Sequence, residues 1–441
     1  MKLSDDFLKA LKKNLDPELI LTNPEDCARY SHDDSRHQGL AEVVVFARNH
    51  ADVVHIVKTC YEFTVPITAR GLGTGTPGGA VPIYGGLVLS LEKMNKIIEF
   101  DPDNRFIKVQ SGILNQTVQD SVAEKNFFWP PDPGSAANCT VGGNIAYNAG
   151  GPRAVKYGAT RENVLGMTVV TGTGDTIYIG SYTTKSAVGY DLTRLLIGSE
   201  GTLGIVTEAI LKLMPLPEKI MTLLIKYKDI QSATLAATKI MSQPYIPSAL
   251  EFLDESASKL INIDAGAVLL INLEDETQES HIRTVVTNSG LMDITVAKTP
   301  EELKKLWSAR KSLSPALKTL SPHKINEDIV IPVSKIPEFL EFLKYISQKY
   351  NIKIVSFGHA GNGNIHVNLL APRSEESQEA LGEIFHKVIS LKGTLSGEHG
   401  IGLEKMDYIN LAIDHTSLEI MRKIKKIFDP KSILNPGKIF L

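Results

Sequence analysis

Cysteine is scarce in this chain of 441 residues: Cys27, Cys60 and Cys139 are odd in number and lie far apart. Such usage fits a reducing compartment. It also excludes an iron–sulfur cluster held by this chain alone, because such clusters are held by several closely placed thiolates. Any cluster used in the protein's function must therefore sit on a partner.

An excess of positive charge is also absent, since the formal net charge is −3 and the pI is about 6.4. A surface built to neutralise phosphates is not expected, and nucleic acid is excluded as a partner. No run reaches the roughly 18 to 20 apolar residues of a membrane span. The first 16 residues mix charges among apolar positions, which predicts an amphipathic helix and no signal peptide. We expect a cytoplasmic protein, held at a membrane at most through a partner.

The chain is long enough, and with 43% hydrophobic residues apolar enough, for two domains. Val53, Ile56, Val57 and Cys60 have helical spacing, and the β-branched stretch at 65–68 predicts a strand after it. The next predicted element is a helix, with Leu114, Val118 and Val122 on one face. A pair of strands is then predicted within 163–179. The half up to about residue 215 is therefore predicted to be glycine-rich and mixed α/β.

Two prolines in Met214–Lys219 mark the predicted domain boundary. Beyond it, 221–227 and 267–274 are predicted strands separated by helices. A helical face through Ile336, Phe339, Leu340, Leu343 and Ile346 begins with Pro337 in its first turn. Two strands joined by the stretch Gly358–Asn368 come next. This second half is predicted to be α+β.

The loop Ala69–Pro82 contains a formal GxGxxG at Gly73, Gly75 and Gly78. A nicotinamide-binding Rossmann turn requires a helix directly afterwards, but Pro82, Gly85 and Gly86 follow, so that interpretation is disfavoured. The loop remains either an anion-binding nest for a pyrophosphate or a tight structural turn. Two further glycine-rich loops, Pro130–Gly158 and one around Gly198–Gly204, indicate a ligand longer than half a dinucleotide.

His359 and His366 lie seven residues apart and would point to opposite faces of a continuous strand. The intervening Gly361, Asn362, Gly363 and Asn364 predict a turn that brings both imidazoles to one side. With Glu398 as the available carboxylate, beside His399, the three residues make a sensible divalent metal site. A purely structural hairpin is the equal alternative on these residues alone.

The order and spacing of the three glycine-rich loops resemble the flavoprotein family of vanillyl-alcohol oxidase and p-cresol methylhydroxylase. The nearest branch is that of flavin-dependent D-2-hydroxyacid dehydrogenases, which includes D-lactate dehydrogenase and the catalytic subunit of glycolate oxidase. The resemblance implies an α+β protein with a two-subdomain FAD-binding domain at 1–215, whose core is about 36–215. It also implies a substrate and metal domain with an antiparallel sheet at 216–441, of which about 405–441 packs back on the FAD domain.

The resemblance further implies a cofactor site for FAD. The binding is expected to be non-covalent, because no histidine that could tether the flavin lies in these loops. The residues expected to bind FAD are Arg70, Gly71, Gly73, Thr74, Gly75, Gly78, Gly79, Pro131, Asp132, Ser135, Thr140, Gly143, Asn144, Asn148, Glu200, Gly201, Gly204 and Val206.

In the same family the histidine motifs form a metal site, so the resemblance implies zinc or manganese on His359, His366 and Glu398, with His399 as the catalytic base. Asn362 departs from the aspartate of many relatives, which affects support of the ligands and metal preference. The resemblance also implies that the substrate is bound by Arg310, Ser314, Lys324 and Asn368. Taken without the resemblance, Arg310 and Lys324 would be ordinary solvated side chains.

The implied reaction is metal-assisted oxidation of a D-2-hydroxy acid, foremost D-lactate or glycolate, to the 2-oxo acid, with hydride transfer to flavin N5. Electrons would pass to an iron–sulfur subunit, an electron-transferring flavoprotein, a cytochrome or a quinone; a homodimer also remains open. The alternatives are a D-2-hydroxyglutarate dehydrogenase and a flavin-carrying subunit without chemistry of its own. The nicotinamide-dependent class would give a colourless protein.

Overall fold

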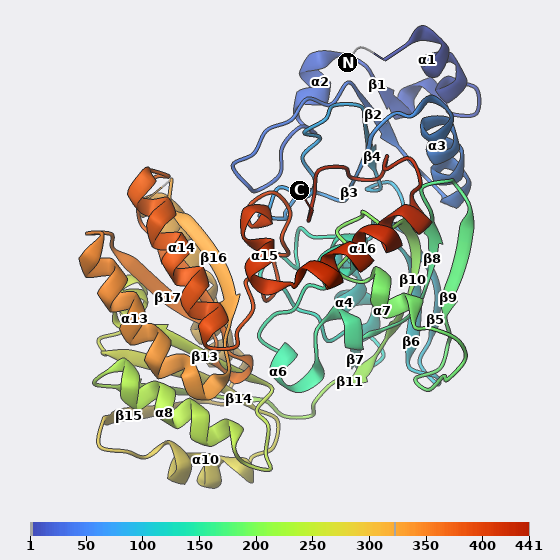
Figure 1. Cartoon of the computed structure of the whole chain (residues 1–441). Helices are drawn as coiled ribbons and strands as arrows, with labels where there is room; N and C mark the ends of the chain where they lie inside the picture. Colours follow the sequence, from blue (N-terminus) through green and yellow to red (C-terminus); the bar gives the residue numbers. More distant parts are fainter. Residues whose placement is uncertain (1–2, 322, 441) are drawn as a thin grey trace. The chain divides into compact units, whose positions relative to one another are not determined.

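The computed structural model describes residues 3–321 and 323–440, which divide into two compact units (Figure 1). The first unit comprises the chain up to Gly150, Gly158–Leu216 and the residues from Glu398 onward. The second comprises Gly151–Tyr157 and Pro217–Gly397. The chain passes between units at Leu216 and Pro217, inside the proline-bearing stretch that the sequence marks as a boundary. In the described part of the chain no helix has the length and apolar character needed to cross a bilayer.

The first unit holds two sheets. A four-stranded sheet has the order β1-β2-β4-β3 and pairs β2 with β4 and β3 with β4 in parallel. A five-stranded sheet, β5-β6-β10-β8-β9, is antiparallel throughout. Their strands are β1 (Ile20–Leu21), β2 (Val43–Phe46), β3 (Ile67–Arg70), β4 (Leu87–Ser90), β5 (Ile97–Asp101), β6 (Phe106–Gln110), β8 (Val164–Val170), β9 (Thr176–Gly180) and β10 (Ile205–Lys212). A short pair, β7 (Phe127–Phe128) with β11 (Met214–Pro215), lies apart from them.

Helices bury one apolar face against each of these sheets. Val53, Ile56, Val57 and Cys60 of α3 are fully buried in the core of the four-stranded sheet. Val118 and Val122 of α4 lie in the core of the five-stranded sheet, where α16 also packs, as Figure 1 shows. The helices of this unit are α1 (Asp5–Lys12), α2 (Pro24–Ala28), α3 (His50–Phe63), α4 (Asn115–Ala123), α5 (Val141–Tyr147), α7 (Leu192–Leu196), α15 (Ile409–Ala412) and α16 (His415–Phe428).

The second unit is built on one seven-stranded sheet of order β15-β12-β14-β13-β17-β18-β16, in which every neighbouring pair is antiparallel. Its strands are β12 (Met221–Tyr227), β13 (Ala249–Asp254), β14 (Ala267–Leu273), β15 (Leu291–Ala297), β16 (Ile325–Val330), β17 (Ile354–His359) and β18 (Asn364–Leu369). Its helices are α6 (Ala154–Tyr157), α8 (Ile230–Met241), α9 (Glu255–Leu260), α10 (Gln278–Val286), α11 (Pro300–Lys311), α12 (Leu313–Leu320), α13 (Ile336–Lys349) and α14 (Glu375–Ser390).

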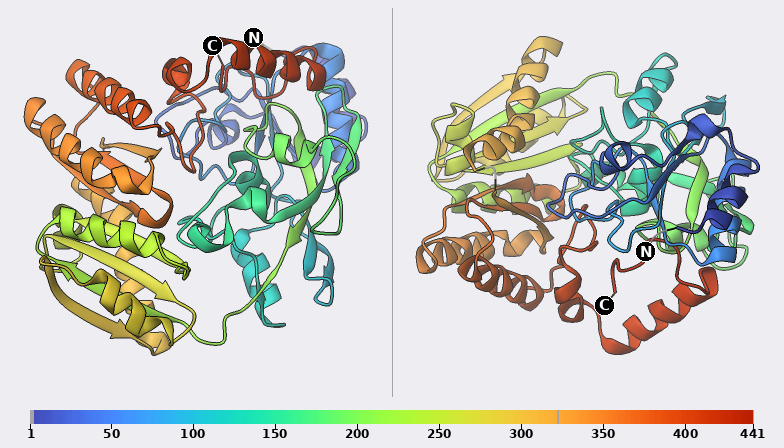
Figure 2. Two further views of the ribbon diagram at one scale, coloured as in Figure 1. Left: turned by 60° about the horizontal axis from the view of Figure 1, so that its bottom comes forward. Right: turned by 90° about the horizontal axis from the view of Figure 1, so that it is seen from above.

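Helices cover this sheet on both faces. α8, α13 and α14 lie side by side on one face, as Figures 1 and 2 show from three directions. The opposite face carries Leu253, Leu270 and Phe357, which pack against Leu313 and Leu317 of α12. Since side chains alternate along a strand, every second residue of β13 and β17 points to this second face. Glu251 and His359 belong to that set.

Most of the predicted elements are confirmed. α1, α3, α4 and α13 occupy the expected helical stretches, β8 and β9 form the predicted strand pair, and no helix interrupts residues 71–86, all of which are described. The predicted strand at 65–68 is displaced by two residues, because Pro66 has no N–H to donate and regular pairing begins at Ile67. The predicted α+β class and the antiparallel sheet of the second half are confirmed.

Candidate functional site

The turn between β17 and β18 places two histidines on one face of the sheet. His359 ends β17, the turn Ala360–Asn362 follows, and Gly363 has φ 76°, a left-handed conformation that suits glycine. His366 then pairs across the ladder with Phe357. Because Phe357 and His359 are two residues apart on β17, all three side chains share a face. The two imidazole rings lie 5.4 Å apart between centroids.

Glu398 completes a group of three ligating side chains. One ligand atom each from His359, His366 and Glu398 lies within 4.8 Å of the others. The placement of Glu398 follows from its neighbour: the Gly397 N–H donates to Asp328 Oδ2 at 2.8 Å, and Ser396 Oγ donates to the same oxygen at 3.0 Å. Two imidazoles and a carboxylate suit zinc or manganese with open coordination positions. The half-buried His399 follows directly in the chain.

Arg310 and His359 share one buried carboxylate. Glu251, which pairs with His359 across β13 and β17, is 0% exposed. His359 Nδ1 lies within hydrogen-bond distance of Glu251 Oε1, and Arg310 donates from Nε at 2.9 Å and from Nη2 at 2.7 Å to Oε2. Burial alone would raise the pKa of Glu251, but His359 and Arg310 outweigh it and hold that pKa below its usual value.

Two of the other three predicted substrate residues contact each other, and the third lies on the exposed side of a helix. Lys324 Nζ donates to Asn368 Oδ1 at 2.8 Å, so these two are brought together beside β16 and β18. Asn368 is 1% exposed, and its Nδ2 also donates to the carbonyl groups of Val355 and His366. Ser314 lies exposed on α12, the buried side of which is formed by Leu313 and Leu317.

In the first unit, the glycine-rich loops are packed edge to edge. A Cβ added at Gly71 would meet Thr140 Oγ1 at 2.3 Å, and one at Gly79 would meet the Tyr147 hydroxyl at 1.5 Å. Only glycine permits this approach of the first loop to α5 and its N-cap. Thr140 caps α5 by accepting from the Gly143 N–H at 3.1 Å. Arg70 donates to the carbonyl of His32 at 2.6 Å and thereby supports the loop.

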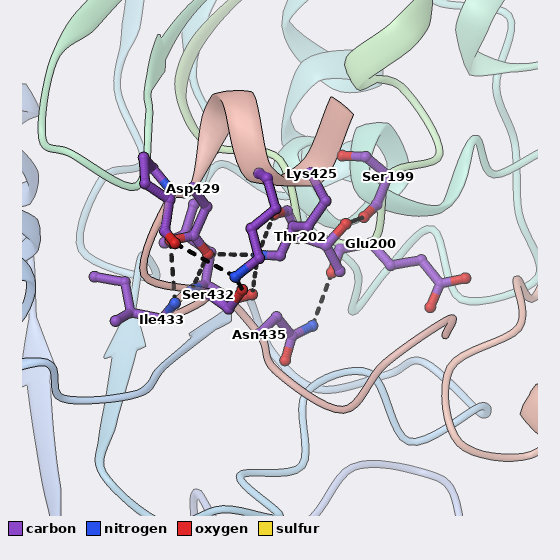
Figure 3. Close-up of polar contacts among 11 residues, drawn as sticks. Ser199, Glu200, Thr202, Lys425, Asp429, Ser432, Ile433 and Asn435 are labelled. Carbon is purple, nitrogen blue, oxygen red and sulfur yellow. Dashed lines mark hydrogen bonds and ion pairs between the residues drawn. The ribbon is translucent and has the colours of Figure 1, made fainter. Parts of the chain in front are cut away.

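The third loop and the C-terminal segment meet at Glu200, a residue with φ 54°. The Glu200 N–H donates to the Ala146 carbonyl on α5, and its carboxylate accepts from Ile401 N and Gly402 N at 2.7 and 2.8 Å. Asn435 Nδ2 donates to the carbonyls of Gly79 at 2.9 Å and Glu200 at 2.7 Å. Figure 3 shows Asn435 directed at Glu200. One asparagine thus joins the first and third loops.

A second anchor fixes the C-terminal segment. Asp429, which is 0% exposed, pairs with Lys425 and accepts from the N–H groups of Ile433 and Leu434 at 3.1 and 2.7 Å. Lys425 also donates to the Thr202 carbonyl at 2.7 Å, as Figure 3 shows. Burial lowers the pKa of Lys425, with Asp429 opposing that shift.

The loops of this unit leave polar atoms for a ligand. Within the described residues, Asn144 Nδ2, Ser111 Oγ and Asn435 Oδ1 are buried without a hydrogen-bond partner. Buried polar groups normally find a partner in the protein, in water or in a ligand. Half-buried glycine backbone and unpartnered polar atoms fit a long polar cofactor such as FAD.

Family comparison decides the assignment. The family model "FAD binding domain" matches residues 41–180, and "FAD linked oxidases, C-terminal domain" matches 216–439, about half of the chain. The chain belongs to the FAD-linked oxidase family. This FAD-linked oxidase is therefore an FAD flavoprotein and an oxidoreductase, as predicted.

Named relatives cover nearly all of this oxidase. It is 41% identical to glycolate oxidase subunit GlcD of Bacillus subtilis, over 93% of this chain and 92% of that one. It is 37% identical to a D-lactate dehydrogenase of Anaerostipes hadrus (97% and 96% covered) and 31% identical to a D-2-hydroxyglutarate dehydrogenase of Stutzerimonas stutzeri (98% of each). Crystalline p-cresol methylhydroxylase with substrate bound shares the fold, with TM-score 0.82, 17% identity and 99% and 96% coverage. The predicted family is confirmed, and the fold is the one shared by p-cresol methylhydroxylase.

Several residues at these sites were not predicted. No role was assigned from the sequence to Glu251, Tyr147, Asn435 or Asp328. Glu251 carries a usable signal, since it is a lone charge between Leu250 and Phe252 on a strand whose other residues are apolar up to Asp254. Asn435 carries no such sequence signal, because its partners Gly79 and Glu200 lie 356 and 235 residues away along the chain.

Proposed function

We propose that this FAD-linked oxidase is a metal-assisted D-2-hydroxy-acid dehydrogenase acting on D-lactate or glycolate. The observation that carries the proposal is the convergence of His359, His366 and Glu398. The second unit, which holds the two histidines, also presents Arg310 and Lys324. Two imidazoles with a carboxylate suit a divalent ion, and the two cations suit a carboxylate substrate. The names of the relatives, which include a glycolate oxidase subunit and a D-lactate dehydrogenase, support this substrate class.

The roles of the residues follow from their chemistry. His359, His366 and Glu398 would hold the ion. The ion would supply a lowered pKa of the substrate hydroxyl, and FAD would supply the acceptor for the hydride from the carbon that bears that hydroxyl. His399 takes the hydroxyl proton as general base. Arg310 and Lys324 hold the carboxylate, and Asn368 fixes the ammonium group of Lys324 through the contact at 2.8 Å.

The reaction removes two electrons and two hydrogens from the CH–OH group and leaves a 2-oxo acid. Continued turnover requires an acceptor for the electrons. Since the described chain has only three cysteines, all of them buried and none in a disulfide, we infer a separate acceptor, for which an iron–sulfur subunit, a flavoprotein, a cytochrome or a quinone is suitable. The word "subunit" in the name of the Bacillus relative supports a partner chain.

Anaerobic flavin bleaching tests the proposal. The purified holoprotein is mixed with D-lactate, L-lactate, glycolate or D-2-hydroxyglutarate, and flavin absorbance is followed. We expect rapid bleaching by D-lactate or glycolate, slow bleaching by L-lactate, and loss of bleaching after chelation or in His399→Ala with FAD still bound. Full-rate bleaching after removal of the metal would contradict its role. Preferential bleaching by D-2-hydroxyglutarate would replace the proposed substrate by that dicarboxylate.

A further inference from the structure

Glu251 occupies a central position in the seven-stranded sheet. It lies on β13 between β14 and β17, opposite Leu270 on one side and His359 on the other. Its side chain is fully buried, which is costly for a charge that has no partner. The position requires a reason beyond the fold, because Leu250, Phe252 and Leu253 show what the strand otherwise uses.

The two carboxylate oxygens of Glu251 serve two different side chains. Oε1 lies against His359 Nδ1, and Oε2 accepts both Nε and Nη2 of Arg310 at 2.9 and 2.7 Å. The Arg310 guanidinium also lies 4.5 Å from the centre of the Phe357 ring. Arg310 is thus fixed by a carboxylate along one edge and an aromatic ring beneath it.

The contact with His359 selects the nitrogen that is open to an ion. An imidazole that donates its Nδ1 proton to a carboxylate keeps Nε2 as its lone-pair nitrogen. Ring rotation is also restrained, because the two residues face each other across paired strands. Glu251 therefore presents His359 in the form that a metal requires.

The contact with Arg310 selects the edge that is open to substrate. A guanidinium has five N–H donors, and Glu251 takes the side formed by Nε and one N–H of Nη2. A second carboxylate can then be met only by the end formed by Nη1 and the remaining Nη2 donor. The arginine is pre-aimed, with little rotamer freedom left to lose on binding.

We propose that Glu251 is a positioning residue that couples the two halves of this site: one carboxylate orients His359 for the metal and Arg310 for the substrate carboxylate. This inference rests on the proposed function. It predicts that one substitution weakens two separable binding events, which neither His359 nor Arg310 does alone.

The metal arm of the test uses Glu251→Gln in the full-length holoprotein. Metal content after dialysis, and the affinities for Zn²⁺ and Mn²⁺ in competition with a chelator, are measured without any assay of turnover. Loss of the outer partner of a ligating histidine typically weakens metal binding 10- to 100-fold. We expect that loss in Glu251→Gln, near-complete loss in His359→Ala, and little change in Arg310→Met.

The carboxylate arm uses propionate, which lacks the hydroxyl group that a metal would bind. Calorimetric titration of chelated holoprotein isolates the contact with Arg310. The amide of Glu251→Gln directs N–H groups at the guanidinium, so we expect propionate to bind about tenfold more weakly or worse. Arg310→Met should weaken it at least as much, whereas His359→Ala should leave it nearly unchanged.

Asp254→Asn is the matched control. Asp254 is a buried carboxylate on the same strand, but its oxygens accept backbone N–H groups of Ala257 and Ser356. Its substitution should lower the urea midpoint and leave both affinities unchanged. If Glu251→Gln does not fold, Glu251→Asp takes its place. That shorter carboxylate cannot span both partners, so at least one affinity should fall.

The outcomes separate this inference from the proposed function. If His359→Ala binds metal normally, the proposed metal site is wrong. If His359→Ala loses metal while the folded Glu251 variant keeps wild-type affinity for both probes, the metal site stands and the coupling role is refuted. A fall in both affinities equal to that of Asp254→Asn would reduce Glu251 to a general structural role.

Discussion

The two units each bury a glutamate, and the two are held in opposite ways. Glu251 of the second unit is fully buried against Arg310 and His359, and its pKa lies below the usual value. Glu200 of the first unit is 5% exposed and is held by the backbone N–H groups of Ile401 and Gly402. Burial raises the pKa of Glu200 to about 7, against the lowering effect of those N–H groups.

The comparison shows what keeps a buried carboxylate charged. At Glu251 the guanidinium of Arg310 and the imidazole of His359, both in direct contact, offset the loss of hydration, whereas two amide dipoles do so only in part at Glu200. Lys438 lies near enough to lower the pKa of Glu200, yet burial lowers its own pKa to about 8. One unit therefore holds a fixed charge and the other holds a group that titrates near neutrality.

Removing the carboxylate of Glu251 should have the largest effect. In Glu251→Met the guanidinium of Arg310 remains largely buried without its partner, and breaking such a pair costs about 3–5 kcal/mol. Urea unfolding at pH 7 measures the loss. The double variant Glu251→Met/Arg310→Met removes both charges and should recover much of the stability. A double variant as unstable as the single would show that packing, and not the orphaned charge, dominates.

Glu200 should give a pH-dependent effect that Glu251 does not. Its pKa rises from 4.5 to about 7 on folding, so the folded chain keeps a proton that the unfolded chain has released between these values. Stability from this group is complete below pH 4.5 and is lost as pH rises through 7, by about 3 kcal/mol in total.

Urea unfolding of the flavin-free protein at pH 5 and pH 8 tests this sign. We expect Glu200→Gln to gain stability relative to wild type by about 2.5 kcal/mol between the two pH values, since part of the total is already lost at pH 5. Asp254, whose pKa is raised to about 6 by burial, titrates in both proteins and cancels from the difference. An unchanged difference between pH 5 and 8 would refute the raised pKa of Glu200.

Local pattern predicted those parts of both units that depend on near neighbours in the chain. Helical spacing located α3 and α13, and the glycine and asparagine turn located the two histidines on one face, because each signal lies within about ten residues. The partners of Glu251 come from β17 and α11, 108 and 59 residues away. Periodicity shows that a strand is present, but not which strand lies beside it.

In the first unit, too, local pattern did not predict the contacts between residues far apart in the chain. Glycine density predicted three loops for one long ligand, but the bond from Asn435 to Gly79 and the contact of Glu200 with Ile401 depend on where the C-terminal segment packs. Arg70 stays a predicted FAD-binding residue, and in the structure its guanidinium donates to the carbonyls of His32 and Leu72.

Asp328 is another buried carboxylate, and the groups that hold it can be compared with those around the two glutamates. It is fully buried and accepts from three neutral donors: Asn364 at Oδ1, and Ser396 Oγ and the Gly397 N–H at Oδ2. In Asp328→Asn an amide faces some of these donors, which leaves buried groups unpaired at about 1–3 kcal/mol. We expect a lower urea midpoint and weaker Zn²⁺ binding, since Gly397 precedes Glu398. Unchanged Zn²⁺ affinity in a destabilised protein would refute this support of Glu398.

Thr140 provides the smallest and cleanest contrast with Glu200, because it satisfies a backbone N–H in the same unit with a neutral oxygen. Its hydroxyl caps α5 at Gly143, and loss of such a cap costs about 1 kcal/mol. Thr140→Ala should therefore lower the free energy of unfolding by that amount equally at pH 5 and pH 8, whereas Thr140→Ser, which keeps the cap, should recover most of it. A loss in Thr140→Ala that grew with pH would mean that the cap acts through Glu200. The neutral cap would then no longer stand apart from the titrating carboxylate.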